Sequence, residues 1–315
     1  MESIQYSVNI VIPVVLLIVL GYALKQAKMM DDRFIGMGSK LAFTFAIPVN
    51  LFNGIYVSGM GEKWDYALLI FCILAVLASA ALLIAVVPRF VKDGPRAASM
   101  VQGMYRSNFV LIGTPLVADA FGAAAAPLVS LVMPFAITLF NICAVLIFTT
   151  LAPAAGKKLS VKGQLLAIAK NPLVIACVLS IAVSVSGLRF PKMVDKTLSY
   201  VGNMAVPLSL LLLGGQIDLK AGLLQGKLSL VASLVRCGLV PLVSVLLAAL
   251  LGFRGARLMV VFVLMAAPAS VSSFVMSREM GGDAQLSADI VALSTVLSAF
   301  TLTAGIALMK GLNWL

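Results

Sequence analysis

The sequence predicts an all-α, polytopic membrane protein, and three observations support this fold class. First, 62% of its 315 residues are hydrophobic and only 11% are charged, whereas a soluble domain carries about 25% charged residues. Second, apolar stretches of about 20 residues recur along the chain, and each is long enough to cross about 30 Å of hydrocarbon. Third, two of these stretches are interrupted by proline and polar residues, a pattern typical of transporter binding sites.

Ten apolar segments are expected to cross the membrane as helices. The first lacks a preceding basic region and a clear cleavage site, so it is expected to be a retained helix rather than a signal peptide. A basic linker, Lys157–Ala169, follows the fifth segment and is expected to lie on the inner leaflet as a short helix. The predicted spans are Val8–Leu24, Leu41–Tyr56, Tyr66–Val87, Met100–Phe121, Pro127–Leu151, Asn171–Leu188, Thr197–Leu213, Leu228–Leu251, Leu258–Ser277 and Leu286–Met309.

The ten spans divide into two halves, residues 1–155 and 156–315, that share landmarks. Ala46–Phe52 in the second span resembles Ala205–Leu211 in the seventh, with a proline at the third position of each. In both halves a second proline follows in a later span. An odd number of spans in each half inverts one half relative to the other, so the sequence predicts a five-plus-five inverted repeat. The four landmark prolines are Pro48 and Pro115, Pro207 and Pro268.

The net charge of +11 does not indicate a nucleic-acid partner, because the cations lie mostly between apolar spans. With the N-terminus outside, fourteen lysines and arginines fall in inside loops and seven in outside segments. Loops on the cytoplasmic side of a membrane are enriched in these residues. The sequence therefore predicts a multi-pass protein of the cell membrane with both termini extracytoplasmic.

The titratable residues argue against an enzyme and against a metal site. The chain has no histidine, and its four cysteines lie inside apolar spans, where they are expected to be small buried hydrophobes. A membrane-embedded enzyme would need paired acids or a histidine cluster to hold a metal. Neither is present, so we expect no catalytic residue, no metal and no cofactor. The cysteines are Cys72, Cys143, Cys177 and Cys237.

Helix-breaking sequences interrupt the fourth and ninth spans, at Gly113-Thr114-Pro115 and at Ala266-Ala267-Pro268. Broken backbone inside a membrane is tolerated only within protein or beside a water-filled cavity. Since the halves are inverted, two new half-helices would begin near the membrane centre and direct their partly positive N-termini at one small volume. That volume suits a carboxylate. The alternative is a simple proline kink in each packed helix. Hydroxyls that could assist binding belong to Thr114, Ser270, Ser272 and Ser273.

Polar side chains near the breaks are the candidate substrate ligands. Arg106 precedes Pro115 by nine residues, so it is expected ~13 Å toward the cytoplasm. It either snorkels to the interface as an anchor or binds an organic anion. Asn108 could bond to substrate or to the opened backbone. Asn50 and Asn141 lie inside apolar spans, where they either join helices or contact substrate.

Three charged residues remain open to more than one interpretation. Asp119 and Asp289 are the acids nearest the spans, and either could couple transport to protons if burial tunes it. Alternatively, both are interfacial and simply ionised. Arg236 lies inside the eighth span, where it either pairs with an acid across the bundle or marks a cavity wall.

These landmarks resemble the auxin efflux carrier family, which includes plant auxin exporters and bacterial malonate and malate permeases. The resemblance implies that the fourth and ninth spans cross at their breaks. It also implies a scaffold of spans one, two, six and seven, a mobile core of the others, and a homodimer formed through the scaffold. The Asn-Pro-Asn motif of the plant carriers is absent from span four, so auxin itself is not expected as substrate. The matching residues are Ile47–Phe52, Arg106–Asn108, Gly113–Pro115, Gly122, Asn141 and Pro268.

The predicted function is secondary transport of a small organic anion, a carboxylate or dicarboxylate, by an alternating-access elevator mechanism. Its expected partners are the anion, the lipid bilayer and a coupling proton or Na+, with no nucleic acid. The main alternative is a sodium-coupled symporter of bile-acid-type amphipathic anions. A channel or sensor is a further alternative, which countertransport would argue against.

Overall fold

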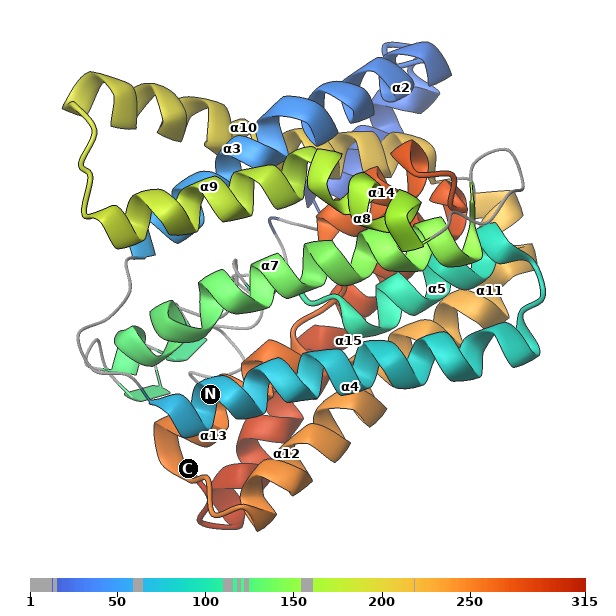
Figure 1. The fold of residues 1–315 in the computed structure, drawn as a ribbon. Coiled ribbons are helices and arrows are strands. Elements are labelled where there is room, and N and C mark those ends of the chain that lie inside the picture. Colours follow the sequence, from blue (N-terminus) through green and yellow to red (C-terminus); the bar gives the residue numbers. More distant parts are fainter. Residues whose placement is uncertain are drawn as a thin grey trace.

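The computed structural model describes residues 13, 16–58, 65–109, 116–117, 120–121, 125–153, 161–217 and 219–315 (Figure 1). Within these residues the regular structure is helical, apart from one isolated β-bridge. The predicted all-α class is therefore confirmed for the described part of the chain. The expected helix on the basic linker is also present, as α8 (Val161–Lys170).

The remaining helices follow the order of the predicted spans, with the largest differences at the second span, whose helix begins at Asp32, and at the fourth, where α5 ends at Tyr105. A helix at Leu16–Gln26 comes first. It is followed by α2 (Asp32–Leu41), η1 (Ala42–Ala46), α3 (Ile47–Ser58), α4 (Tyr66–Phe90), α5 (Gly94–Tyr105), α7 (Ala126–Leu151), α9 (Pro172–Ser186), α10 (Lys192–Gln216), α11 (Leu219–Leu234), η4 (Val235–Leu239), α12 (Val240–Leu250), α13 (Gly255–Ala266), α14 (Val271–Glu279) and α15 (Ala284–Gly311).

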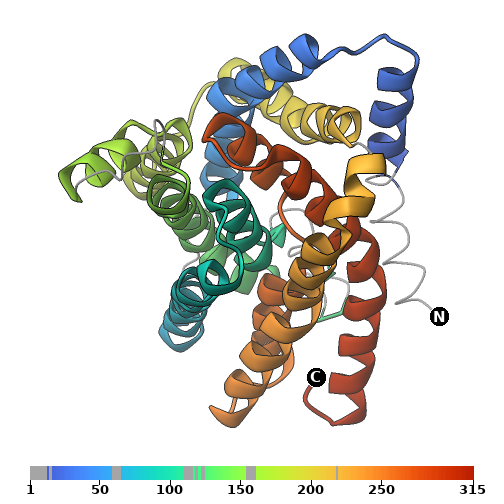
Figure 2. The same ribbon diagram turned by 90° about the vertical axis from the view of Figure 1, so that its right-hand side faces the viewer.

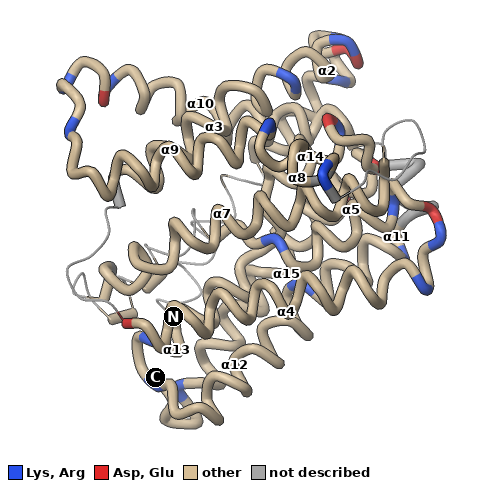
Figure 3. Tube along the Cα trace, in the orientation of Figure 1, with Lys and Arg blue, Asp and Glu red and all other residues tan. Residues whose placement is uncertain are grey.

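Six helices of the described chain are long and apolar enough to cross a membrane, and three shorter apolar helices accompany them. Figure 3 shows the charged residues gathered toward two opposite ends of the bundle, with a mostly uncharged band between them. This distribution fits a protein whose middle lies in hydrocarbon. The six long spans are Asp32–Tyr56, Tyr66–Phe90, Pro127–Leu151, Lys192–Gln216, Gly226–Leu250 and Ala284–Gly311. The ten-span inverted repeat stays a prediction.

The helices pack in two groups, which Figure 1 shows one above the other. In the upper group, α3 packs against α9 and α10, and α10 packs against α2. In the lower group, α4 packs against α5 and α7, while α11 and η4 lie beside α15 (Figure 2). The upper group contains the spans assigned to the scaffold, and the lower group those assigned to the core.

The upper group depends on close backbone approach at glycine. A Cβ atom at Gly214 of α10 would lie 2.0 Å from the carbonyl oxygen of Ile18, and one at Gly202 would lie 3.2 Å from the Cα of Asn50. Small residues let membrane helices approach closely enough for strong van der Waals contact. Asn50 also donates a 3.0 Å hydrogen bond to the Gly202 carbonyl, so this amide joins α3 to α10.

Candidate substrate site at the helix breaks

The two helix breaks lie against each other and satisfy each other's backbone groups. After α5 ends at Tyr105 the chain is extended, and Ser107 forms an antiparallel bridge with Ala269, in the gap between α13 and α14. The Asn108 amide donates to the Pro268 carbonyl at 2.8 Å, and the Ser270 amide donates to the Arg106 carbonyl at 3.2 Å. The exchange removes backbone groups that lipid would leave unpaired.

The break in the ninth span lies where the sequence predicts it, because α13 ends at Ala266 and α14 begins at Val271. The break in the fourth span differs from the prediction. Helix α5 ends at Tyr105, ten residues before Pro115, and Gly113, Thr114 and Pro115 lie outside the described residues. Arg106 is consequently an extended residue that follows α5, not a helical one as predicted.

Arg236 caps the C-terminal ends of both α5 and α13. Its side chain donates to the carbonyls of Met104 and Tyr105 at the end of α5, at 3.3 and 2.8 Å. It also donates to Leu264 and Met265 at the end of α13, at 3.2 and 2.8 Å. A fifth bond of 2.9 Å reaches the Ala267 carbonyl. The guanidinium thus donates hydrogen bonds to the last carbonyls of both half-helices, which have no partner within their own helices.

Arg236 therefore does not pair with an acid, which was one of the two expectations stated above, since all five of its hydrogen bonds go to backbone carbonyls. It projects from η4, a π-helical turn in which the Val240 amide bonds to the Val235 carbonyl. Pro241 follows, and it has no amide hydrogen for the Cys237 carbonyl, which favours a wider turn. Sequence inspection marked Arg236 as unusual, but its partners lie about 30 and 130 positions away.

Arg106 is buried at the break and is held by neutral partners. Its Nη2 donates to the Asn141 side-chain oxygen and to the Ser272 hydroxyl, each at 2.9 Å, and its Nη1 lies 2.8 Å from the Met276 sulfur. Only 3% of its surface is exposed. In this conformation Arg106 does not snorkel to the interface. Among the described residues, no carboxylate forms an ion pair with it.

Helix α7 fixes the orientation of this arginine. The Asn141 amide donates to the Ile137 carbonyl one turn earlier at 2.9 Å, which directs its oxygen at Arg106. The Tyr105 hydroxyl donates to the Phe140 carbonyl at 2.7 Å and attaches the end of α5 to the same helix. Asn141 is fully buried and acts here as an interhelical ligand of Arg106.

A cavity of about 50 Å³ lies between the two helix groups, beside the breaks. Its walls include Asn50 of α3, Ser209 of α10, Asn108 and Ser270 of the break segments, and Ser272 in the first turn of α14. A water molecule needs about 10–15 Å³ of such volume, so the cavity holds a few waters and must widen to admit a dicarboxylate. The Ser272 hydroxyl connects this cavity to Arg106.

Ser209 also lines the cavity, although its match to Asn50 in the sequence did not place it among the predicted substrate ligands. Only 1% of its surface is exposed, and within the described chain its hydroxyl has no hydrogen-bond partner. A signal was present, because Ser209 occupies the position of the seventh span that matches Asn50 of the second. Asn50 of α3 and Ser209 of α10 thus line the same cavity from two different helices.

Other predicted site residues lie elsewhere or cannot be placed. Ser273 is fully buried against α15, where its carbonyl accepts a 3.3 Å bond from the Ser287 hydroxyl, and it does not line the cavity. Asp289 accepts a 2.9 Å bond from Gln285 on the same helix and does not line the cavity either. Asp119 and Gly122 lie outside the described residues.

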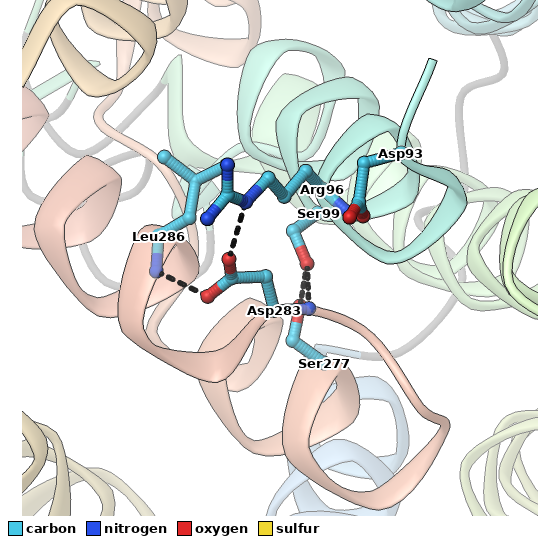
Figure 4. Close-up of polar contacts among 6 residues, drawn as sticks. All are labelled: Asp93, Arg96, Ser99, Ser277, Asp283 and Leu286. Atoms are coloured by element: carbon cyan, nitrogen blue, oxygen red, sulfur yellow. Dashed lines mark hydrogen bonds and ion pairs between the residues drawn. The ribbon is translucent and has the colours of Figure 1, made fainter. Parts of the chain in front are cut away.

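The far ends of α5, α14 and α15 are joined by polar contacts, shown in Figure 4. Arg96 forms a 3.3 Å ion pair with Asp283, and the hydroxyls of Ser99 and Ser277 lie 2.9 Å apart. The Asp283 amide donates to the Ser99 hydroxyl at 2.9 Å. Because α5 and α14 are connected both at the breaks and at these ends, they form one packed unit.

A second, larger groove is a less suitable site for a charged substrate. It measures about 530 Å³ and lies between α4 and the η4–α12 segment, with walls of mainly apolar residues such as Leu74, Leu82 and Leu247. These leucines are exposed on the outer surface of the bundle. An apolar surface of this kind is compatible with lipid and offers an anion few hydrogen-bond donors.

At the breaks, by contrast, several donors converge. The N-terminus of α14 begins at Val271, and partly positive amide groups there face the cavity together with the hydroxyls of Ser270 and Ser272. Arg106 lies behind Ser272. The arrangement can attract and hydrogen-bond an anion.

Comparison with known proteins identifies the family of this chain. The chain matches the family described as membrane transport protein over residues 6–306. No curated protein matches it. The family consists of transporters, and together with the apolar helices it identifies a multi-pass membrane protein that acts on a transported substrate. The resemblance drawn from the two helix breaks is confirmed, and the chain belongs to the membrane transport protein family of auxin efflux carriers.

Proposed function

We propose that this protein is a secondary transporter of a small organic anion, a carboxylate or dicarboxylate, across the cell membrane. The observation that carries the proposal is the Arg106 guanidinium, which is buried beside the cavity with only neutral partners. A buried charge without a counter-ion is costly. A bound carboxylate would supply that counter-ion.

The hydrogen-bond inventory leaves room for such a ligand. A guanidinium has five N–H donors, and the three bonds of Arg106 all come from its two Nη atoms. Arginine binds carboxylates in a two-point geometry, in bonds stronger than those to neutral acceptors. Ser272 already lies between the guanidinium and the cavity, so a small shift of its hydroxyl would open the path to an anion.

The position of the cavity supports an elevator mechanism. Its walls come from α3 and α10 on one side and from the break segments on the other. Sliding the lower group along the upper one would carry the bound anion from one face of the membrane to the other. In this account residues 1–155 and 156–315 form the two inverted repeats, the upper group is the static scaffold, and two scaffolds form the homodimer.

The alternative of a sodium-coupled symporter for bile-acid-type anions fits the site less well. A large amphipathic anion needs a pocket of several hundred Å³, whereas the cavity at the breaks measures about 50 Å³. Coupling to protons through Asp119 or Asp289 remains part of the proposal.

Binding and counterflow test the proposal together. Purified protein is heated with a panel of dicarboxylates and aromatic acids, and a ligand that binds the native state raises the melting temperature. The same anions are then used in counterflow into proteoliposomes. We expect one small carboxylate to stabilise the protein and to accumulate by exchange. If no anion in the panel stabilises the protein or exchanges, the proposal is wrong.

A further inference from the structure

The hydrogen bonds of Arg236 are matched one to one with backbone carbonyls. Nε, Nη1 and Nη2 together donate to five carbonyl oxygens at 2.8–3.3 Å, and an arginine has five N–H groups. The side chain has no exposed surface. Two of the carbonyls end α5, two end α13, and the fifth belongs to the extended residue Ala267. The cluster is therefore complete without any other cation.

Carbonyls in this arrangement make a cation site. The C-terminal end of a helix carries partial negative charge, and here two such ends meet at one point. In transporters with broken helices, half-helix C-termini and unwound carbonyls bind the coupling sodium ion or proton. Arg236 supplies a permanent positive charge at this place, because a guanidinium keeps its proton in proteins.

We propose that Arg236 is a built-in cation that takes the place of a coupling sodium ion, so that anion transport by this protein requires no sodium. This inference rests on the proposed function in one respect, because its statement about sodium-free flux assumes that the protein transports an organic anion. A sodium ion binds and leaves in each cycle, whereas Arg236 is attached to η4 and stays with the breaks. It balances the negative helix ends in every conformation and leaves the positive end of α14, together with Arg106, to attract the substrate.

The wild-type protein gives the first test. Melting temperatures are measured in sodium, potassium and choline chloride at equal ionic strength, and malonate counterflow is measured in the same three salts. We expect the melting temperature to be the same in the three salts. The fluxes should agree within about twofold, which is near the resolution of such assays. Saturable stabilisation by sodium, or flux that needs sodium, would overturn the inference.

Substitution of Arg236 gives the second test. Arg236→Ala leaves the five carbonyls unpaired, so we expect a fall in melting temperature of about 5–10 °C. Millimolar methylguanidinium should restore most of it by filling the vacated place. Arg236→Lys keeps the charge but has only three N–H donors, so its melting temperature should lie between those of the wild type and Arg236→Ala. If Arg236→Ala does not fold, the comparison of Arg236→Lys with the wild type replaces it.

Arg254 offers a matched control, because its Nη1 also donates to two carbonyls, of Ala249 and Phe253, both at 2.7 Å, but at a partly exposed position. We expect Arg254→Ala to respond little to methylguanidinium. If Arg236→Ala melts at the wild-type temperature, Arg236 is not the cation that these carbonyls need. The role is also contradicted if methylguanidinium does not raise the melting temperature of Arg236→Ala and Arg236→Lys melts at the same temperature as Arg236→Ala. Both melting experiments are decisive even if malonate is not transported, so the inference and the proposed function can fail separately.

Discussion

The Arg106 guanidinium at the end of α5 donates a 2.9 Å hydrogen bond to the side-chain oxygen of Asn141 in the middle of α7. The two residues are 35 positions apart, and both are buried. The contact directs a cation at the cavity between the helix groups without neutralising it. The first prediction follows from the absence of a negative charge beside Arg106 among the described residues.

Replacing Asn141 with aspartate should supply Arg106 with an internal counter-ion. The two side chains have nearly the same shape, so Asn141→Asp should fold, and the new carboxylate should compete with substrate for the guanidinium. We expect the affinity for malonate to fall at least about tenfold, equivalent to about 1.4 kcal/mol. Calorimetric or thermal-shift titration measures it. Asn313→Asp, at an exposed position near the C-terminus, is the control, and equal affinity in the two variants would refute the prediction.

Two substitutions at Ser209 separate the size of the cavity from its polarity. Ser209→Leu should fill the space of about 50 Å³ and lower transport at least about tenfold, since added volume in a packed site costs about 1–3 kcal/mol. Ser209→Ala removes a buried hydroxyl that lacks a partner in the described chain. It should leave the melting temperature unchanged or slightly higher. Counterflow that is equal in the leucine and alanine variants would show that the cavity is not on the transport path.

The close approach of helices in the upper group predicts a strong effect at Gly214. Its Cβ position lies 2.0 Å from the Ile18 carbonyl oxygen, so Gly214→Ala must push two helices apart and should cost about 1–3 kcal/mol. Gly54→Ala is the matched control, because no atom lies within 4 Å of its Cβ position. In that variant alanine should be neutral or stabilising by up to about 1 kcal/mol, as expected inside a helix. Melting curves of both proteins decide the comparison, and equal shifts would contradict the packing described here.

A polar contact between the helix groups predicts a shift in conformational equilibrium. Arg278, at the end of α14, donates to the Gln216 side chain of α10 and lies 3.5 Å from the Asp32 carbonyl of α2. Arg278→Ala removes this link, which only one arrangement of the two groups can form. We expect the labelling rate of a cysteine introduced at position 209 to change about threefold, since partly exposed contacts contribute below about 1 kcal/mol.

For that experiment Arg96→Ala is the control, because it breaks an ion pair within the lower group, between α5 and Asp283. It should alter stability without changing the labelling rate. An equal change of labelling in both variants would mean that Arg278 does not connect moving parts.

Much of the fold follows from local sequence properties. The spans from Tyr66 to Phe90 and from Ala284 to Gly311 agree with the prediction within a few residues, because their hydropathy and their capping residues Asp65 and Asp283 are local signals. The ninth-span break at Pro268 was also predictable, since a missing amide is a property of the residue itself.

The position of the fourth-span break was not predictable in this way. Gly113-Thr114-Pro115 is the stronger local breaker, yet α5 already ends at Tyr105, where its last carbonyls accept hydrogen bonds from Arg236 of η4. The environment of Arg106 is equally non-local, since its partners Asn141 and Ser272 lie on α7 and α14. Only the assembled bundle shows that this cation is buried.

The affinity of the Arg106→Gln variant for malonate tests the central claim most directly. Glutamine keeps hydrogen-bond donors near Asn141 and Ser272 but removes the charge, so substrate binding should weaken at least about 100-fold, equivalent to about 2.7 kcal/mol. Arg89→Gln, which changes an exposed cation at the end of α4, should bind as the wild type does. If Arg106→Gln protein, correctly folded by its melting curve, binds and transports the anion with wild-type affinity and rate, Arg106 is not the substrate's counter-ion and the account is wrong.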